Sequence, residues 1–189
     1  IRVLSRLPEI IIGAGNQSEL LIRLVNVLVT GIPRATAVAI VSTDQTDLQA
    51  QPHVLHWDRR FITDEDFHPS EQLIRKAVGK NESIAYFWSS ESADVNKGYT
   101  VSAGVDWAFA TPVRGEACGG WAIYVAGRVK GALDVESRVS DPQDLRDELK
   151  FTELVASTLG NLMELRRLER RHTKLGQFFS PVVLDALSG

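Results

Sequence analysis

Cysteine and long apolar runs are the scarcest features of this sequence. Cys118 is its only cysteine, so no disulfide can form within the chain, and we expect a reducing, cytoplasmic setting. No apolar run approaches the roughly 18 to 20 residues that a membrane-spanning helix needs. The opening segment, IRVLSRLPEI, has neither a signal-peptide pattern nor an initiator methionine, and we therefore expect a fragment of a larger protein.

Charge of one sign and catalytic motifs are also missing. The net charge of −3 gives no broad basic field, so we expect neither a nucleic-acid partner nor a membrane partner. The sequence contains no P-loop, no G-x-G-x-x-G motif and no G-x-S-x-G motif. It therefore predicts no catalytic residue and no cofactor.

The titratable residues do not form a convincing metal site or nucleophile. His53 and His56 are three residues apart on an expected strand, which predicts opposite faces and argues against a metal pair. The segment TDEDFH (63–68) offers carboxylates and a histidine without an activating partner, and a solvated turn is the favoured interpretation. Cys118 lies in a tight turn, which favours a surface thiol over a chromophore-attachment or redox site.

Apolar periodicity divides the 189 residues, 44% of them apolar, into the elements of one domain. Helices are predicted at 16–31, at 69–79 with Pro69 as its first residue, and from about 144 to 179. Strands are predicted at 36–43, at 53–58, at 83–88 and on both sides of the turn RGEACGG (114–120). The segments 89–106 and 128–144 are predicted loops. This order, with strands joined as hairpins, predicts an α+β fold with an antiparallel sheet covered by helices.

The long C-terminal helix has two differently patterned halves. In the first half, a broad apolar face suits packing on a sheet; it consists of Leu154, Val155, Leu159, Leu162 and Met163. In the second half, residues three and four apart form the narrow seam of a coiled coil: Leu165, Leu168, His172, Leu175 and Phe179. We expect a parallel homodimer through this seam, loosened by acid if His172 faces its copy. The alternative is a single helix with a solvated basic face.

The order of these segments resembles a GAF domain. The resemblance rests on LLIRLVNVLV, ATAVAIVSTD, PSEQLIRKAV, SIAYFW and FATPVRGEACGGWAIYVAGR, and it covers roughly residues 16–165. It implies a PAS-related antiparallel sheet of five to six strands, flanked by helices, with a long C-terminal signalling helix. Residues 1–15 would then be an N-terminal linker or helix, 16–165 the sensor domain, and 166–189 a coiled-coil connector to an output domain.

The C-terminal segment has a more specific resemblance. RRHTKLGQFFSPVVLDAL (170–187) is similar to the connector between a GAF module and a class III adenylate or guanylate cyclase domain in bacterial proteins, often with an FHA domain upstream. The resemblance implies a regulatory sensor and dimerisation module for a C-terminal cyclase in signal transduction. Two alternatives remain: a module that controls another output, such as a kinase or transcription regulator, and a stand-alone small-molecule enzyme.

A ligand of this module is not identified by the sequence. Cyclic-nucleotide-binding GAF domains have a spaced N-K-…-F-…-D-E signature, and here Asn96 and Lys97 have no matching phenylalanine or Asp-Glu pair after them. We therefore expect no tight binding of cyclic AMP or cyclic GMP. Aromatic residues could line a small-molecule pocket between the sheet and the 89–106 loop, or they could form core; the candidates are Trp57, Tyr86, Trp88, Tyr99, Trp107 and Phe109.

Overall fold

The fold is seen in a computed structural model that describes residues 16–44, 46–47, 50–60, 67–88, 105–128 and 142–178, with the side chains of 144–173 in the last range. The elements in chain order are α2 (Gln17–Gly31), β1 (Ala35–Ser42), β2 (His53–Arg59), α3 (Glu71–Lys80), β3 (Ile84–Phe87), β4 (Trp107–Pro112), η3 (Glu116–Cys118), β5 (Trp121–Gly127), η4 (Pro142–Leu145) and α4 (Arg146–Phe178).

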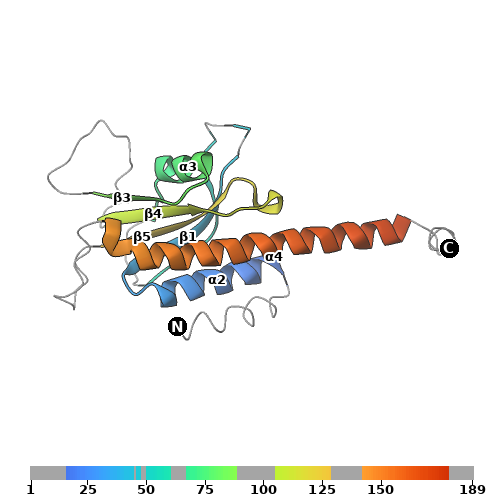
Figure 1. Cartoon of the computed structure of the whole chain (residues 1–189), viewed down its shortest axis with the longest axis horizontal. Coiled ribbons are helices and arrows are strands. Elements are labelled where there is room, and N and C mark those ends of the chain that lie inside the picture. Colours follow the sequence, from blue (N-terminus) through green and yellow to red (C-terminus); the bar gives the residue numbers. More distant parts are fainter. Residues whose placement is uncertain are drawn as a thin grey trace.

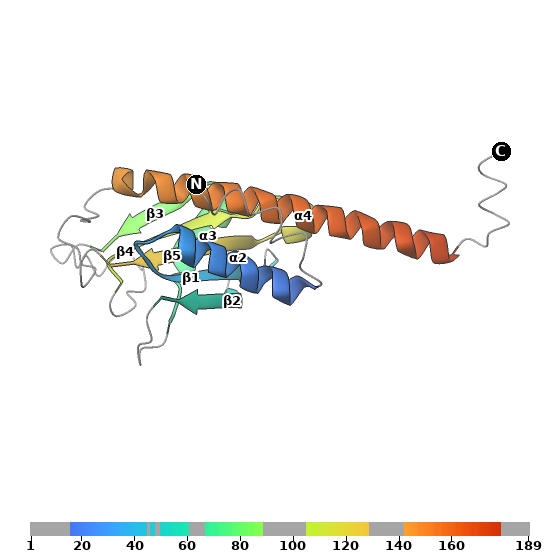
Figure 2. The ribbon, with the colours of Figure 1, turned by 90° about the horizontal axis from the view of Figure 1, so that it is seen from below.

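The strands form one antiparallel sheet of five strands in the order β2-β1-β5-β4-β3. Helices α2 and α4 lie side by side on one face, and α3 covers the other (Figures 1 and 2). The predicted α+β fold and the two hairpins, β1–β2 and β4–β5, are confirmed. Glycine has the backbone role expected at the second hairpin, since Gly115 and Gly120 have φ angles of 120° and 82°.

Alternation along the central strands divides the core into two layers. On β5, Ile123 and Val125 pack with α2 and α4, whereas Tyr124 faces α3. Successive side chains in a strand point to opposite faces of the sheet. When both faces are covered, the sequence of the strand is therefore apolar at every position. The main core therefore lies between the sheet and the pair α2 and α4, and a second core lies under α3.

Helix α2 has the start that its sequence predicts. The Asn16 side chain accepts a hydrogen bond of 2.8 Å from the backbone N–H of Glu19, as an N-cap residue does. The buried face of the helix consists of Leu20, Leu21, Leu24, Val25, Val27 and Leu28. Burial of each large apolar side chain contributes about 1.5 to 3 kcal/mol, so this face holds α2 on the sheet.

The ends of α3 differ from the prediction. The helix begins at Glu71 with Ser70 as its N-cap, so Pro69 precedes the cap instead of occupying the first helical position. At the other end the helix runs through Gly79 to Lys80, and Asn81 adopts the left-handed conformation with φ 53°. Asparagine tolerates this conformation better than most residues, and it replaces glycine as the C-terminal signal here.

A bulge in β2 changes the relation between the two histidines of that strand. The register pairs His53 with Ser42 and His56 with Ile40, and Leu55 is the extra residue between them. Ser42 and Ile40 are two residues apart on β1, so the argument that His53 and His56 must face opposite sides is wrong. No cluster of three or more histidine, cysteine, aspartate or glutamate side chains suited to a metal occurs among the described residues.

Helix α4 is a continuous helix of 33 residues that packs on the sheet with one face and then extends past it (Figures 1 and 2). Val155, Ala156 and Leu159 are fully buried or nearly so, whereas Leu154 is 48% exposed. The sequence prediction placed Leu154 on the sheet-packing face, which is wrong. Leu154 instead belongs to an exposed stripe that continues through Leu165 and Leu168, 53% and 51% exposed.

Several predictions concern residues outside the described part of the chain. These are the N-terminal segment 1–15, Asn96, Lys97 and Tyr99 in the predicted loop, and Phe179 with the rest of the C-terminal connector; for Leu175 only the helical backbone is described. The boundary predicted after residue 165 falls within α4 and stays a prediction. None of the described helices combines the length and the apolar character required to cross a membrane.

Candidate functional site

The sheet surface that faces α3, here called the floor, contains many small side chains. Five of its buried floor residues are alanines from the three central strands: Ala39, Ala108, Ala110, Ala122 and Ala126. Larger side chains enter this layer from its edges and from α3, where Leu73, Ile74 and Ala77 are buried. An alanine side chain is a single methyl group and offers few contacts. The larger side chains around the floor therefore decide what this face can contact.

Aromatic rings form two separate groups on this floor, one towards the β2 edge of the sheet and one at the β3 edge. Phe67, just before α3, stacks on Trp57 of β2 with ring centroids 5.1 Å apart and lies 6.0 Å from the ring of Tyr124 on β5. From β3, Tyr86 and the following Trp88 meet edge to face at 5.1 Å. These distances are typical of favourable aromatic pairs. The face therefore has one aromatic group contributed by β2, β5 and the segment before α3, and a second group at β3 on the opposite edge of the sheet.

Tyr124 and the start of α3 are joined by a buried polar contact. The backbone N–H of Ser70 donates a hydrogen bond to the phenolic oxygen of Tyr124. Burial raises the pKa of Tyr124 to about 12, although the hydrogen bond from Ser70 acts in the opposite direction. The tyrosine is therefore a neutral phenol at physiological pH, and it offers a hydrogen-bond donor inside the α3 layer.

Two polar atoms in this layer are buried without a partner: Oγ of Ser70 and Nε1 of Trp88. Ser70 is fully buried, and although it is the N-cap of α3, its side chain makes no capping hydrogen bond. A buried polar atom without a partner costs about 1 to 3 kcal/mol, so native proteins usually satisfy it with protein, water or ligand. The hydroxyl lies beside Tyr124 and the indole N–H beside Tyr86, and each is a group that a small ligand could satisfy.

The structure separates the aromatic residues that the sequence proposed for one pocket. Trp57, Tyr86 and Trp88 belong to the α3 face, and a pocket that they share with the 89–106 loop stays a prediction. Trp107 and Phe109 lie on the other face, fully buried under α2 and α4, with their rings stacked 6.1 Å apart. The alternation of β4 explains this, since Ala108 and Ala110 face α3 and their neighbours must face away.

Sequence reasoning missed Phe67, Ser70 and Tyr124. The signal for Tyr124 was available, because the alternation in WAIYVAG places it with Ala122 and Ala126 on the face opposite Ile123. Ser70 precedes the first acidic residue of a helical pattern, which is a typical N-cap position. The Ser70 hydroxyl lacks a partner because of how the chain packs around it, and no sequence pattern predicts this.

A polar cleft of about 400 Å³ lies between the end of α3, the start of β3 and α4. Within it the hydroxyl of Ser83 donates to the Glu153 carboxylate at 2.7 Å and lies 3.2 Å from the hydroxyl of Thr111. Histidine does not occur among the residues that line the cleft, so the serine has no base of the kind that activates it as a nucleophile. The pair is a structural link between the sheet and α4.

Cys118 differs from the prediction of a surface thiol. Its side chain is fully buried in η3, where the β4–β5 turn meets α4. Burial, with a smaller contribution from the negative charge of Glu164, raises the pKa of the Cys118 thiol to about 12. A thiol of this kind stays protonated near neutral pH and is a poor nucleophile.

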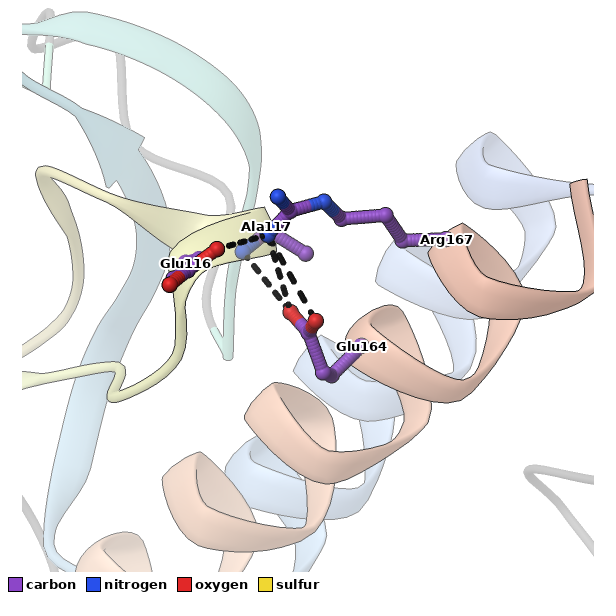
Figure 3. Close-up of polar contacts among 4 residues, drawn as sticks. All are labelled: Glu116, Ala117, Glu164 and Arg167. Atoms are coloured by element: carbon purple, nitrogen blue, oxygen red, sulfur yellow. Dashed lines mark hydrogen bonds and ion pairs between the residues drawn. The ribbon is translucent and has the colours of Figure 1, made fainter. Parts of the chain in front are cut away.

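The turn above Cys118 is fastened to α4 by polar contacts (Figure 3). Glu164 accepts a hydrogen bond of 3.2 Å from the backbone N–H of Ala117, and Arg167 donates to Glu116 at 2.6 Å. Arg167 also lies 3.4 Å from the Glu164 carboxylate. Its hydrogen bond and charge lower the pKa of Glu116 below the ordinary value. We name these four residues, Glu116, Ala117, Glu164 and Arg167, the hairpin clamp.

Comparisons with known proteins identify the architecture. No protein-family model matches the sequence, and no curated protein matches it either. Among solved structures, the GAF domain of an Acinetobacter phosphoenolpyruvate-protein phosphotransferase is similar with a TM-score of 0.60 at 12% identity, covering 88% of this chain and 93% of that one. The GAF domain of the Coxiella burnetii phosphoenolpyruvate-protein phosphotransferase gives 0.58 at 15% identity, over 90% and 95%.

An enzyme has a similar structure. The free methionine-R-sulfoxide reductase of Neisseria meningitidis, solved in complex with its substrate, gives a TM-score of 0.56 at 12% identity, covering 88% of this chain and 91% of that one. Identities this low relate folds and leave function open. The five-stranded antiparallel sheet, the helices on both faces and the long α4 are thus those of the GAF-like fold, as the sequence resemblance predicted.

Proposed function

We propose that this chain is a regulatory sensor and dimerisation module of a cytoplasmic signalling protein, and that it controls a class III nucleotidyl cyclase. The observation that supports the proposal best is the double role of α4. One face of the helix packs on the sheet through Val155 and Leu159, while another exposes Leu154, Leu165 and Leu168. The same helix thus joins the main core of the domain to a surface suited to a partner.

The exposed stripe has the spacing of a parallel coiled coil. Leu154, Thr158, Asn161, Leu165, Leu168 and His172 follow one another in steps of four and three residues. In heptad terms the leucines at 154 and 168 occupy d positions and Leu165 an a position, and these are the two core positions of a coiled coil. Monomeric proteins rarely expose such rows of leucine, and pairing with a second copy would cover them.

The sensor role is supported by the α3 face. A sensor needs a site whose occupancy changes the free energy of a state that the output detects. The buried, unpartnered polar atoms of Ser70 and Trp88 provide groups that a ligand can satisfy. Tyr124, which contacts both Ser70 and the ring of Phe67, links such a ligand to β5, and β5 pairs with β4, the strand whose hairpin is clamped to α4.

The choice of a cyclase as the output rests on the sequence resemblance of residues 170–187 alone. Class III cyclases, as a family, assemble their active sites between two catalytic domains, so a parallel pair of α4 helices is a suitable controller. A kinase or transcription regulator as the output is the alternative. The residues encoded after Gly189 decide between them: a domain with the metal-binding aspartates of a cyclase supports the proposal, and any other output domain contradicts it.

The enzyme alternative is less well supported, although one similar structure is a reductase. Reduction through a thiolate needs an ionised, accessible cysteine, and the only cysteine here is buried with its pKa raised. The direct test is to incubate the purified chain with free methionine-R-sulfoxide and a thiol reductant. Enzyme-dependent formation of methionine would contradict the purely regulatory proposal.

Dimerisation is tested by sedimentation equilibrium of the parent and of Leu165→Glu with Leu168→Glu. We expect a dimeric parent and a monomeric double variant, because each buried leucine contributes about 1.5 to 3 kcal/mol. The matched control is Leu165→Met with Leu168→Met, which keeps the stripe apolar and should stay dimeric. A monomeric parent at tens of micromolar, or a charged variant as dimeric as the parent, would remove the coiled coil from the proposal.

A further inference from the structure

A cavity lies on the opposite side of the sheet from the α3 face. It has a volume of about 360 Å³ and is bordered by the first turn of α2, the β4–β5 turn and the part of α4 that passes beyond the sheet. This volume is within the range of roughly 300 to 1,000 Å³ that small-molecule sites occupy. Three elements that are far apart in the sequence therefore meet around a space large enough for a metabolite.

The floor of this cavity is apolar and aromatic. Trp121, the first residue of β5, and Met163 of α4 line it, and both are partly buried against the main core. Ala117 contributes a small side chain from the turn. A flat ring or another apolar body can rest against Trp121 without displacing any charged group.

The rim of the cavity is basic. Arg166, Arg167, Arg170 and Arg171 line it from consecutive turns of α4. Glu116 and Glu164 are the carboxylates beside them, and both pair with Arg167. Arg170 and Arg171 add positive charge to the rim, and this charge is local, since the whole chain has a net charge of −3.

Arg170 and Arg171 are the arginines available to a ligand. Both are exposed, and within the described part of the chain neither forms a hydrogen bond or ion pair. Arg171 lies near enough to Glu116 to contribute slightly to lowering the pKa of that carboxyl, which places its charge beside the hairpin clamp. Gln17 brings the positive end of the α2 dipole to the same cavity.

We propose that this cavity binds a nucleoside phosphate or a closely similar small aromatic phosphate. Planar guanidinium groups bind phosphate oxygens through paired hydrogen bonds, and aromatic side chains stack on nucleobases. Arg170 and Arg171 would hold the phosphate, and Trp121 with Met163 would contact the base. This site is separate from the α3 face, and it adds a second input to the proposed module, at the place where α4 leaves the sheet.

The geometry also gives the ligand a way to act on α4. The cavity shares Ala117 and Arg167 with the hairpin clamp, so an anion at the rim would compete with Glu116 and Glu164 for the same guanidinium. Arg166, Arg167 and Arg170 are at b, c and f positions of the heptad, away from the leucine stripe, whereas Arg171 is at a g position that flanks it. A ligand held by Arg170 and Arg171 would therefore lie beside the dimer seam.

The test is calorimetric titration of the full 189-residue chain with ADP, with adenosine and inorganic phosphate as separate arms. We expect saturable binding of ADP, and binding of either part alone that is at least about tenfold weaker, because each part makes only half of the contacts. Arg170→Gln with Arg171→Gln should weaken ADP binding by about tenfold or more. The matched control removes two cations from the start of the same helix, Arg146→Gln with Lys150→Gln, and should bind ADP as the parent does.

The proposal is overturned if ADP gives no saturable binding, if the double arginine variant binds ADP like the parent, or if the control loses as much affinity. Adenosine that binds as tightly as ADP would also overturn it, because the arginines would then have no role. A single-stranded oligonucleotide that binds more tightly than ADP would point to a nucleic-acid groove instead. Circular dichroism of each variant shows that α4 is still folded.

Discussion

The backbone N–H of Ala117 donates a hydrogen bond of 3.2 Å to the carboxylate of Glu164, 47 residues further along the chain (Figure 3). The bond fixes the β4–β5 turn to α4 at the level where the helix begins to leave the sheet. Any displacement of β5 relative to α4 must therefore break or move this contact. The turn is one hydrogen-bonded route from Tyr124 on the α3 face to the long helix, beside the link through Ser83 and Glu153.

The first prediction concerns this contact. Glu164→Ala removes the acceptor for Ala117 and one partner of Arg167, and we expect the free energy of unfolding to fall by about 1 to 1.5 kcal/mol. Glu169→Ala, an exposed change one and a half turns later, should stay within about 0.5 kcal/mol of the parent. Urea denaturation of the three proteins measures this. Equal losses for both variants would show that the contact with the turn contributes nothing specific.

The second prediction uses two glycines in helices. A Cβ at Gly160 of α4 would overlap the carbonyl oxygen of Arg114, so the helix could not stay so close to the turn. We expect Gly160→Ala to destabilise the fold by about 1 to 3 kcal/mol, as overpacking does. Gly79 of α3 has no atom within 4 Å of the same position, and Gly79→Ala should stabilise by about 0.5 to 1 kcal/mol. Thermal or urea unfolding would contradict the argument if both changes acted in the same direction.

The sequence predicted the elements of this fold better than their contacts. Periodicity gave α2, the hairpins and the long helix, because each of these has a strong apolar pattern and a clear start or turn signal. Periodicity did not predict two local features that interrupt the regular pattern. These are the bulge at Leu55 and the capping of α3 by Asn81 in the left-handed conformation. Both depend on tertiary pairing that a local pattern does not record.

In the candidate sites, too, local patterns could be predicted from the sequence and long-range contacts could not. Alternation in β4 and β5 could have assigned Trp107 and Phe109 to one face and Tyr124 to the other, since only the strand period is needed. The burial of Cys118 could not be predicted in this way, because a residue in a glycine-containing turn is usually exposed. Here α4 covers the turn, and this long-range contact is visible only once Gly160 and Arg114 are placed together.

The third prediction tests the unpartnered hydroxyl of Ser70. Replacement of an N-cap serine by alanine usually costs about 0.5 to 2 kcal/mol, because a helix N–H loses its acceptor. The Ser70 side chain makes no capping hydrogen bond and is buried, so we expect Ser70→Ala to leave the stability unchanged or slightly increased. Asn16→Ala provides the contrast, since Asn16 does cap α2, and it should cost about 1 kcal/mol. A larger loss for Ser70→Ala than for Asn16→Ala would assign the hydroxyl a structural role and weaken the proposed ligand site.

The last prediction concerns alkaline pH. Burial raises the pKa of Tyr124 from its ordinary value of 10.0 to about 12 in the folded protein. Between these values the unfolded chain has lost the phenolic proton while the folded protein keeps it, so unfolding releases a proton and stability falls as pH rises. The contribution of Tyr124 is complete below pH 10.0 and is lost as the pH approaches about 12. Cys118 acts in the same direction from its ordinary value of 9.0 to about 12.

Tyr124→Phe isolates the tyrosine contribution, because it keeps the ring against Phe67 and removes only the hydroxyl. The free energy of unfolding of the parent should fall more steeply with pH above 10.0 than that of the variant, by up to about 1.4 kcal/mol per pH unit. Cys118→Ala, compared by slope and not by absolute stability, should flatten the curve already from pH 9.0. Urea denaturation across this range gives both slopes. Parallel curves for Tyr124→Phe and the parent would mean that the phenol ionises as easily in the folded protein as in the unfolded chain, and the α3 layer would then admit water at Tyr124.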